Sequence, residues 1–295
     1  IGNGKVVVVY RDDGNSYKGT AVVGTISGTS ITFGAESEFN SNAGNWNSVV
    51  YDSTNDKVVI AYTDTGNSSR GYAIVGTVSG TSISFGSEVQ FESGTSIEHS
   101  ATFDSSNGKV VIAYLDNSNS DKGTAVVGTV SGNSISFGTP VVFNNSTTEN
   151  VDVTFDSTNG KVVITYTDNG NSWYGTAIVG TVSGTSISFG SESVFESASS
   201  SEISAVYDSY ADKVVITYRD EGNSSYGTVI AGTVSGTSIS FGSAVVYESA
   251  STDTQSASYD FWNQKVVIGY RDGGNSNQAT AVVTTASSTT LSTGN

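Results

Sequence analysis

The stretch KVVIAYLDNSNSDKGTAVVGTVSGNSISFG, which spans residues 109–138, decides the fold because the chain repeats it. Its opening triplet Lys-Val-Val recurs every 52 residues, at Lys5, Lys57, Lys109, Lys161, Lys213 and Lys265. Most residues around these triplets recur in step, so the chain is one unit written six times. A strict period of this length is typical of propellers and solenoids.

One repeat reads as four short strands separated by turns. Asn107-Gly108 lies between two apolar runs and favours a tight hairpin, because both residues tolerate positive φ. Ser131-Gly132-Asn133 marks a second turn. The predicted strands cover Ser100–Asp104, Lys109–Tyr114, Thr124–Val130 and Ser134–Gly138. Four antiparallel strands in about 50 residues are typical of one propeller blade.

These repeats predict an all-β chain, namely a six-bladed β-propeller of 52-residue four-stranded repeats in which residues 1–295 form a single domain. The second strand of the unit occurs six times but the first only five times, so we expect one inner strand to be missing at a terminus. The chain begins Ile-Gly-Asn-Gly, without an initiator methionine or a signal peptide. We therefore expect it to be a fragment of a longer protein.

Composition argues against several classes of function. The formal net charge of −16 argues against a nucleic-acid partner, because such proteins need a basic surface to neutralise phosphates. The chain has no cysteine, which excludes disulfides, thiolate metal sites and thiol nucleophiles. No apolar run approaches the roughly 20 residues that span a bilayer, so we expect no membrane insertion.

Variation among the copies is expected on one face of the propeller. The connections after the second and fourth strands emerge on the same face of each blade, which is the face where propellers usually bind ligands. Hairpin turns on the other face, such as Ser79-Gly80-Thr81, barely change from copy to copy. The connections after the fourth strand do change, and they cover residues 42–47, 94–99, 146–152, 198–203 and 250–255.

An Asp-x-Gly-Asn-Ser loop follows the second strand in most copies. Carboxylate, amide and hydroxyl oxygens are hard ligands that could hold Ca²⁺, although the distal bidentate glutamate of an EF-hand is absent. The alternative is structural, with Asp and Asn bonded to their own backbone and glycine at positive φ. Recurrence in every blade favours this alternative, and no other cofactor is expected. The candidate metal ligands are Asp12, Asp64, Asp116, Asp168, Asp220 and Asp272.

Aromatic residues gather on the variable face. Tyr17, Trp173, Tyr174 and Tyr226 occupy the two positions after Asn-Ser, and Trp46 lies in a variable connection. Exposed rings stack on the apolar faces of sugars, while neighbouring Asn, Asp and Ser side chains bond the hydroxyls. These five residues are candidate ligand-binding residues. The alternative is that they are ordinary exposed aromatics on an outer rim.

Arg11, Arg219 and Arg271 occupy one repeat position, in copies that are neighbours if the ring closes. Together they could form a sector that favours an anion, and they are candidate binding residues. The alternative is that each offsets the aspartate that follows it. The segment Asp168-x-Gly170-x-x-Trp173 partly resembles the Asp-box of sialidases, but it lacks the initial Ser or Thr and lies in a different loop.

A catalytic centre is not expected. The single histidine, His99, follows Glu98 at the predicted mouth of the channel and is a further candidate binding residue. Paired carboxylates across a channel could hydrolyse a glycosidic bond. However, no pair is singled out by spacing among the acids of comparable connections, which are Glu149, Asp152, Glu202 and Asp253. Near-equivalent loops in every blade favour repeated binding over one asymmetric catalytic site.

The phrases Gly-Thr-Val-Ser-Gly-Thr-Ser-Ile-Ser-Phe-Gly (76–86, 180–190 and 232–242) and Lys-Val-Val-Ile-x-Tyr-x-Asp resemble repeats of marine bacteriophage tail-fibre and tail-associated proteins. The resemblance covers essentially the whole chain. It implies a virion protein involved in host attachment, and it supplies no catalytic residues. Together with the exposed aromatic residues, it leads us to expect a non-enzymatic propeller, in a virion or at a cell surface, that binds cell-surface glycans. The alternatives are a structural spacer that docks other fibre subunits, a bacterial surface adhesin and, last, a glycan depolymerase.

Overall fold

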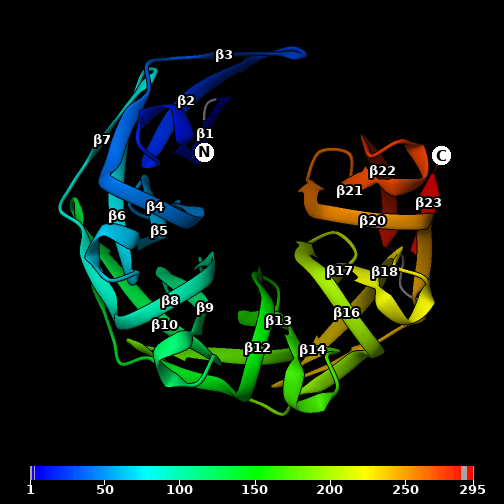
Figure 1. Ribbon diagram of the computed structural model, residues 1–295. Coiled ribbons are helices and arrows are strands. Elements are labelled where there is room, and N and C mark those ends of the chain that lie inside the picture. Colours follow the sequence, from blue (N-terminus) through cyan, green and yellow to red (C-terminus); the bar gives the residue numbers. More distant parts are fainter. Residues whose placement is uncertain (1, 3, 287–290, 295) are drawn as a thin grey trace. The chain divides into compact units, whose positions relative to one another are not determined.

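The computed structural model of the chain describes residue 2, residues 4–286 and residues 291–294. It consists of antiparallel β-strands joined by tight turns (Figure 1). The chain divides into two compact units, which comprise the residues up to Val142 with Ser183–Ile187, and Phe143–Val182 with the residues from Ser188 onward. In the described part of the chain, no helix is long and apolar enough to cross a bilayer.

Strands and 3-10 turns follow one another in the same order in each copy. The first unit contains β1 (Lys5–Asp12), β2 (Lys18–Ser27), β3 (Ser30–Phe33), β4 (Ser37–Asp52), β5 (Lys57–Asp64), β6 (Arg70–Ser79), β7 (Ser82–Phe85), β8 (Val89–Asp104), β9 (Lys109–Asp116), β10 (Lys122–Ser131) and β11 (Ser134–Phe137). Its 3-10 turns are η1 (Asp13–Asn15), η2 (Thr65–Asn67) and η3 (Asn117–Asn119).

The second unit begins within β12 (Val141–Asp156). It continues through β13 (Lys161–Asp168), β14 (Tyr174–Ser183), β15 (Ser186–Phe189), β16 (Ser193–Asp208), β17 (Lys213–Asp220), β18 (Tyr226–Ser235), β19 (Ser238–Phe241), β20 (Val245–Asp260), β21 (Lys265–Asp272), β22 (Gln278–Ala286) and β23 (Leu291–Gly294). The turn between β14 and β15 is grouped with the first unit. The 3-10 turns are η4 (Asn169–Asn171), η5 (Glu221–Asn223) and η6 (Gly273–Asn275).

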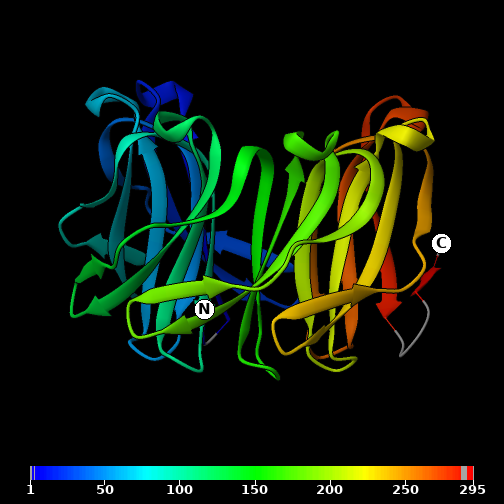
Figure 2. The ribbon, with the colours of Figure 1, turned by 90° about the horizontal axis from the view of Figure 1, so that it is seen from below.

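The predicted hairpins of one repeat are confirmed. Asp104 pairs with Lys109 across the turn between β8 and β9, and Gly108 takes a φ of +62° there. β9 pairs with β10, and β10 pairs with β11 around Gly132, whose φ is +60°. Within each unit the 3-10 turns lie at one end of the strands and the tight turns that precede strands such as β9 lie at the other (Figure 2).

The connection that was expected between the fourth strand of one repeat and the first strand of the next is itself a strand. In the first unit, β8 is 16 residues long. Its first half pairs with β6, for example Ala73 with Val89, and its second half pairs with β9, for example Phe103 with Val110. The expected first strand is therefore only the second half of a strand that belongs to two consecutive sheets. The variable residues lie at its middle, where the register shifts between Ile97 and Ser100.

Consecutive sheets within a unit pack face to face. In the interior copies, the strand that begins with the repeat lysine is buried on both sides, as in β9, where Val110 to Tyr114 are all 0% exposed. Small residues on one sheet, such as Ala61 and Ala73, meet larger residues on the next, such as Ile112. Burying an isoleucine side chain contributes about 1.5–3 kcal/mol. The second unit repeats this packing with Ala177 against Ile216.

The two ends of the described chain differ from the interior copies. β5 lies between β4 and β6, whereas in the described residues β1 is paired with β2 alone. A sixth short strand, β23, pairs with β22 although the copy lacks the usual phenylalanine. The single-domain propeller with one missing inner strand stays a prediction.

Candidate functional site

The turn after the second strand of each copy is a capped 3-10 turn. The aspartate that ends the strand accepts a hydrogen bond from a backbone N–H two or three residues later, which stabilises the turn. Asp12 Oδ1 accepts from Gly14 N at 2.9 Å, and Asp272 Oδ1 accepts from Gly274 N and Asn275 N at 2.8 and 3.1 Å. Thus each candidate metal ligand is engaged by its own turn.

The capping aspartates are not gathered into a site with other ligands. In the part of the chain that the structure describes, no three acidic or histidine side chains lie close enough together to hold a metal ion. Burial raises the pKa of Asp116 and of Asp220. The remaining candidates Asp64, Asp168 and Asp272 are buried as well, whereas Asp12 is partly exposed. The arrangement supplies turn capping, and calcium binding stays a prediction.

Each 3-10 turn ends in two residues with left-handed backbone. Ser16 and Tyr17 have φ values of 56° and 63°, and Ser172 and Trp173 have values of 59° and 58°. This conformation is uncommon for residues other than glycine. The side chain of the second residue lies at the tip of the turn, where Tyr17 is 52% exposed and Trp173 is 47% exposed. These two rings are therefore exposed in the turn after the second strand, and their part in ligand binding stays a prediction.

A second left-handed position lies at the middle of each long strand. It recurs every 52 residues, at Trp46, Glu98, Asn150, Glu202 and Thr254, with φ values between 47° and 54°. The register shifts here, as between Asn45 and Ser48, which marks a β-bulge. Left-handed non-glycine residues cost about 1–3 kcal/mol each and cluster at functional sites. Trp46 is the one large hydrophobic residue of the five, and it is 50% exposed.

Arg11, Asn45, Trp46 and Asn47 line a pocket of about 370 Å³ in the first unit, here named the Trp46 pocket. Tyr17 belongs to its surroundings because its ring centroid lies 5.1 Å from Arg11 Cζ, which is a cation–π contact. The structure thus brings together three residues that the sequence proposed from separate segments, namely Arg11, Tyr17 and Trp46.

Some polar groups of the Trp46 pocket are held by hydrogen bonds, and one acceptor has no hydrogen-bond partner. Arg11 Nη1 donates to Asn45 Oδ1 at 3.0 Å, and Arg11 Nε pairs with Asp13 at 2.9 Å. Asn47 Oδ1 is buried and has no hydrogen-bond partner. An exposed indole, a guanidinium and a free amide oxygen can together hold a sugar, since the ring stacks while hydroxyls exchange hydrogen bonds.

The other two candidate arginines are ion-paired in the second unit. Arg219 Nη1 contacts Asp253 Oδ1 at 2.6 Å, and Arg271 Nη2 contacts the other oxygen of Asp253. Arg219 Nε also lies 3.2 Å from Glu221. The hydrogen bond from Arg271, together with the charge of Arg219, holds the pKa of Asp253 below its usual range. The guanidinium charges are therefore largely offset by carboxylates.

A hollow of about 450 Å³ lies beside one of these arginines. Its lining includes Arg271, the bulge residue Thr254 and Asn277, which occupies the repeat position of Tyr17. The corresponding place in the second unit thus keeps the arginine but has no aromatic ring from either loop.

His99 does not lie at an open mouth, as the sequence suggested, but is only 7% exposed. Ser96 Oγ lies 3.0 Å from Nε2, and the rings of Phe91 and Tyr114 pack against the imidazole. Burial lowers the pKa of His99 to about 3, although a hydrogen bond with the backbone of Trp46 opposes part of this lowering. His99 is thus a neutral core residue that supports the bulge carrying Trp46.

The remaining aromatic candidates lie in the second unit. Tyr174 and Tyr226 begin β14 and β18, are partly buried, and pair with Asp168 and Asp220 at the ends of the preceding strands. Trp173 is exposed beside Tyr174.

Acidic residues at the bulges connect neighbouring long strands within the second unit. Asp152 Oδ2 accepts from Ala205 N at 2.7 Å, and Glu202 Oε2 accepts from Thr254 N at 3.1 Å. With Asp253 held by two arginines, these carboxylates have structural partners.

Sequence reasoning missed three exposed aromatic residues on the opposite turns. Tyr210, Phe261 and Trp262 are 71%, 64% and 88% exposed, and the rings of Phe261 and Trp262 lie 5.7 Å apart. Tyr210 and Trp262 share one repeat position, where other copies carry Thr54, Ser106 or Thr158. The expectation that these turns barely vary was wrong for the last two copies, and a position-by-position comparison of the turns would have revealed it.

Comparison with known proteins extends to structure only, since no protein-family model and no curated relative matches the sequence. The BP39L lectin from Burkholderia pseudomallei has a TM-score of 0.64 at 7% identity, over 97% of this chain and 82% of the lectin. The SapL1 lectin, solved with α-methyl fucoside, has a TM-score of 0.51 at 10% identity, over 98% of this chain and 95% of the lectin.

An enzyme is also similar in structure. Trypanosoma rangeli sialidase in complex with 2,3-difluoro-KDN has a TM-score of 0.56 at 13% identity, over 95% of this chain and 52% of the enzyme. Identities this low show the fold alone. The chain is an all-β protein with the β-propeller fold of these lectins.

Proposed function

We propose that this chain is a non-enzymatic glycan-binding propeller of six blades, and that the Trp46 pocket receives a sugar ring. The observation that carries the proposal is the exposed Trp46 indole beside the Arg11–Tyr17 stack and the unpaired Asn47 amide oxygen. The indole would stack on the apolar face of the ring. Arg11 would donate to hydroxyl or ring oxygens, and Asn47 would accept from a hydroxyl.

A glycan array with the purified chain tests this proposal. We expect saturable binding that Trp46→Ala and Arg11→Ala each weaken at least tenfold, which is about 1.4 kcal/mol. α-Methyl fucoside belongs in the panel, because one lectin of similar fold was solved with it. Trp262→Ala is the matched control, since it removes an exposed tryptophan from the opposite end of the strands. Binding that survives Trp46→Ala unchanged would remove this pocket from the proposal.

Two observations support the proposal of binding over hydrolysis. The bulge acids Asp152 and Glu202 accept hydrogen bonds from backbone N–H groups of the next long strand. The similarity to the sialidase, at 13% identity, is one of fold alone. Release of reducing ends from a bacterial polysaccharide would overturn the non-enzymatic proposal. A tail-fibre, virion or cell-surface setting stays a prediction, and electron-microscopic class averages of the purified chain would count the blades.

Protein docking is the second candidate function. The exposed cluster of the Phe261 and Trp262 rings favours it, as does the exposed Tyr210 at the same repeat position as Trp262. Exposed aromatic patches commonly mark interaction sites. If the cluster docks a second copy of this chain, sedimentation equilibrium will show a mass that rises with concentration. The variant Trp262→Ser with Tyr210→Thr, which restores residue types found in other copies, would then remain a monomer.

A further inference from the structure

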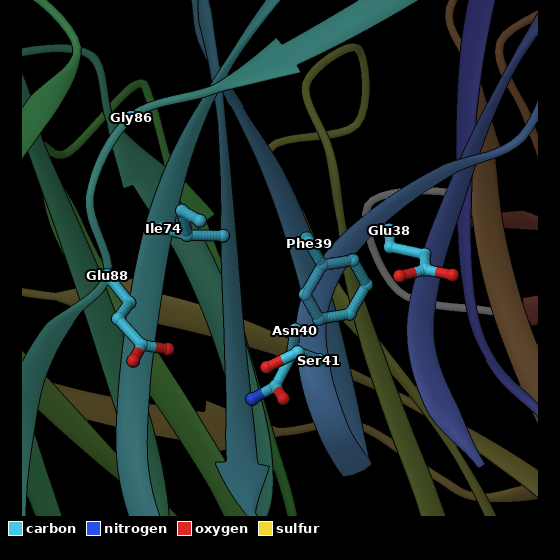
Figure 3. Close-up of a pocket in the computed structure, with 7 residues that line it drawn as sticks. All are labelled: Glu38, Phe39, Asn40, Ser41, Ile74, Gly86 and Glu88. Carbon is cyan, nitrogen blue, oxygen red and sulfur yellow. The ribbon is translucent and has the colours of Figure 1, made fainter. Parts of the chain in front are cut away.

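A second pocket of the first unit, here named the flank pocket, lies away from the residues that the sequence proposed. It has a volume of about 330 Å³ and is lined by Glu38, Phe39, Asn40, Ser41, Ile74, Gly86 and Glu88. Figure 3 shows the side chains of Asn40 and Glu88 directed into the same space, with Glu38 on the other side of the Phe39 ring. The lining comes from β4, β6 and the segment before β8.

One buried polar group in the flank pocket lacks a partner. Asn40 is only 4% exposed, and its Nδ2 has no hydrogen bond of normal geometry. Its Oδ1 accepts from Asn42 N at 2.5 Å, which fixes the orientation of the amide. Nδ2 lies near enough to the Tyr62 hydroxyl to oppose part of the rise in the pKa of that tyrosine. The Tyr62 hydroxyl donates its own proton to Glu88 at 2.7 Å, and Nδ2 does not reach its oxygen in hydrogen-bond geometry.

Comparison with the equivalent place in the second unit explains why Asn40 is unpaired. There the corresponding residue is Asn144, whose Nδ2 donates to Thr148 Oγ1 and to Asp168 Oδ1, both at 3.1 Å. In the first unit the counterpart of Thr148 is Gly44, which has no hydroxyl. The counterpart of Asp168 is Asp64, and its carboxylate accepts from Asn42 instead.

Gly44 also leaves the side-chain oxygen of Asn47 without a partner. In other copies the hydroxyl residue at this position is Ser96, Thr148, Ser200 or Thr252. Ser96 and Thr252 bond to His99 and Gln255, which are the counterparts of Asn47. Gly44 therefore removes the internal partner of both Asn40 and Asn47. An unpaired buried polar group costs about 1–3 kcal/mol, so two such groups beside pockets point to partners that come from outside.

We propose that the flank pocket binds a neutral sugar residue, with Asn40 Nδ2 donating to a hydroxyl oxygen and the carboxylate of Glu88 accepting from a hydroxyl. Phe39 and Ile74 form the apolar wall. A hydrogen bond from Lys18 favours the ionised form of Glu38 and lowers its pKa. Two carboxylates disfavour an anion, so uronic acids and sialic acids are excluded by charge. This site is independent of the Trp46 pocket and goes beyond the proposed function.

Ligand-observed and protein-observed NMR with methyl glycosides of neutral hexoses and deoxyhexoses tests the flank pocket. The Ile74 methyl group reports on this pocket and the Trp46 indole reports on the other. We expect a neutral glycoside at millimolar concentration to shift Ile74, and methyl glucuronide to leave it unchanged. Asn40→Leu should weaken this binding about tenfold. Asn144→Leu is the matched control, because it removes an amide whose partners are internal.

The outcomes separate the two pockets. A glycoside that shifts the Trp46 indole but not Ile74 supports the proposed function and overturns the flank site. Shifts of Ile74 that persist in Trp46→Ala and vanish in Asn40→Leu support the flank site alone. Equal weakening by Asn40→Leu and Asn144→Leu would indicate a general loss of structure and overturn the assignment. No shift of either reporter with any glycoside of the panel would overturn both proposals.

Discussion

The hydroxyl of Tyr62, a fully buried residue, donates to Glu88 at 2.7 Å, whereas the equivalent Tyr114 donates to Glu92 at 2.9 Å. The two glutamates occupy different repeat positions, 26 residues after one tyrosine and 22 residues before the other. For Tyr62, the residue 26 positions later is Glu88 and the residue 22 positions earlier is Asn40. For Tyr114, the residue 26 positions later is Pro140 and the residue 22 positions earlier is Glu92. Each tyrosine therefore has one carboxylate, supplied from either of two places.

This exchange predicts a rescue. Glu88→Ala should lower the free energy of unfolding by about 2 kcal/mol, because it leaves the buried hydroxyl of Tyr62 without its acceptor. Adding Asn40→Glu should recover most of the loss, since Glu92 fills that position beside Tyr114. Urea denaturation of the single and double variants measures both effects. A double variant no more stable than Glu88→Ala would show that the two positions are not interchangeable.

Trp46 should carry a measurable conformational cost. Its φ of 52° is unfavourable for an L-residue with a side chain but natural for glycine. Trp46→Gly is therefore expected to be about 1 kcal/mol more stable than Trp46→Ala, while both lose glycan binding. Thermal and urea denaturation of the two variants make the comparison. Equal stabilities would mean that the bulge stores no strain at this residue.

His99 should remain neutral through the acidic range. With a pKa lowered to about 3, the folded protein binds fewer protons here than the unfolded chain, whose histidine titrates near its usual value of 6.5. The stability contributed by this group is thus fully present above pH 6.5 and falls as the pH drops toward 3. The imidazole ¹³C shifts of this single histidine should not move between pH 8 and 5. A midpoint near 6.5 would contradict its burial.

Calcium should not change the stability. The capping aspartates accept hydrogen bonds from their own turns, and no three candidate ligands converge in the described residues. A metal bound at one hundred times its Kd would add about 2.7 kcal/mol. Melting curves in calcium and in chelator should therefore coincide. A higher melting temperature in calcium, abolished by Asp64→Asn, would establish the metal site that the sequence suggested.

Tyr259 marks an unpaired hydroxyl that one substitution should satisfy. Tyr51 donates to Asp56 at 2.8 Å and Tyr207 donates to Asp212 at 2.7 Å, each five residues later. The hydroxyl of Tyr259 is buried without a partner, and the residue five positions later is Gln264. Gln264→Asp should raise the free energy of unfolding by about 1 kcal/mol. The reverse substitution, Asp56→Gln, should lower it by a similar amount; no change in either variant would contradict the assignment.

The repeat made most of the fold predictable. Asn-Gly and Ser-Gly turns located the hairpins around Gly108 and Gly132, because glycine is the residue that takes positive φ without steric cost. The long strands were not predicted. Their first halves are irregular in sequence, and bulge residues such as Glu98 interrupt their middles, so the long strands do not alternate as a regular strand does.

The candidate site was predictable in part. Aromatic residues at unequal repeat positions pointed to Tyr17 and Trp46, but the sequence did not indicate that both lie near Arg11, because Trp46 stands at a bulge in β4 that was not predicted. The flank pocket was not predictable, since it depends on a hydroxyl that is missing at Gly44. The missing hydroxyl can be recognised as important only when the structure shows that Asn40 is buried and left without a partner.

The length of β8 also bears on how the chain comes apart. Because one continuous strand lies in two sheets, the loss of its pairing with β6 pulls on its pairing with β9. Neighbouring repeats therefore share a strand and are expected to unfold together. Amides of β9 should exchange with deuterium at the rate of the whole unit, and a single proteolytic cut near the bulge of β8 would damage two sheets at once.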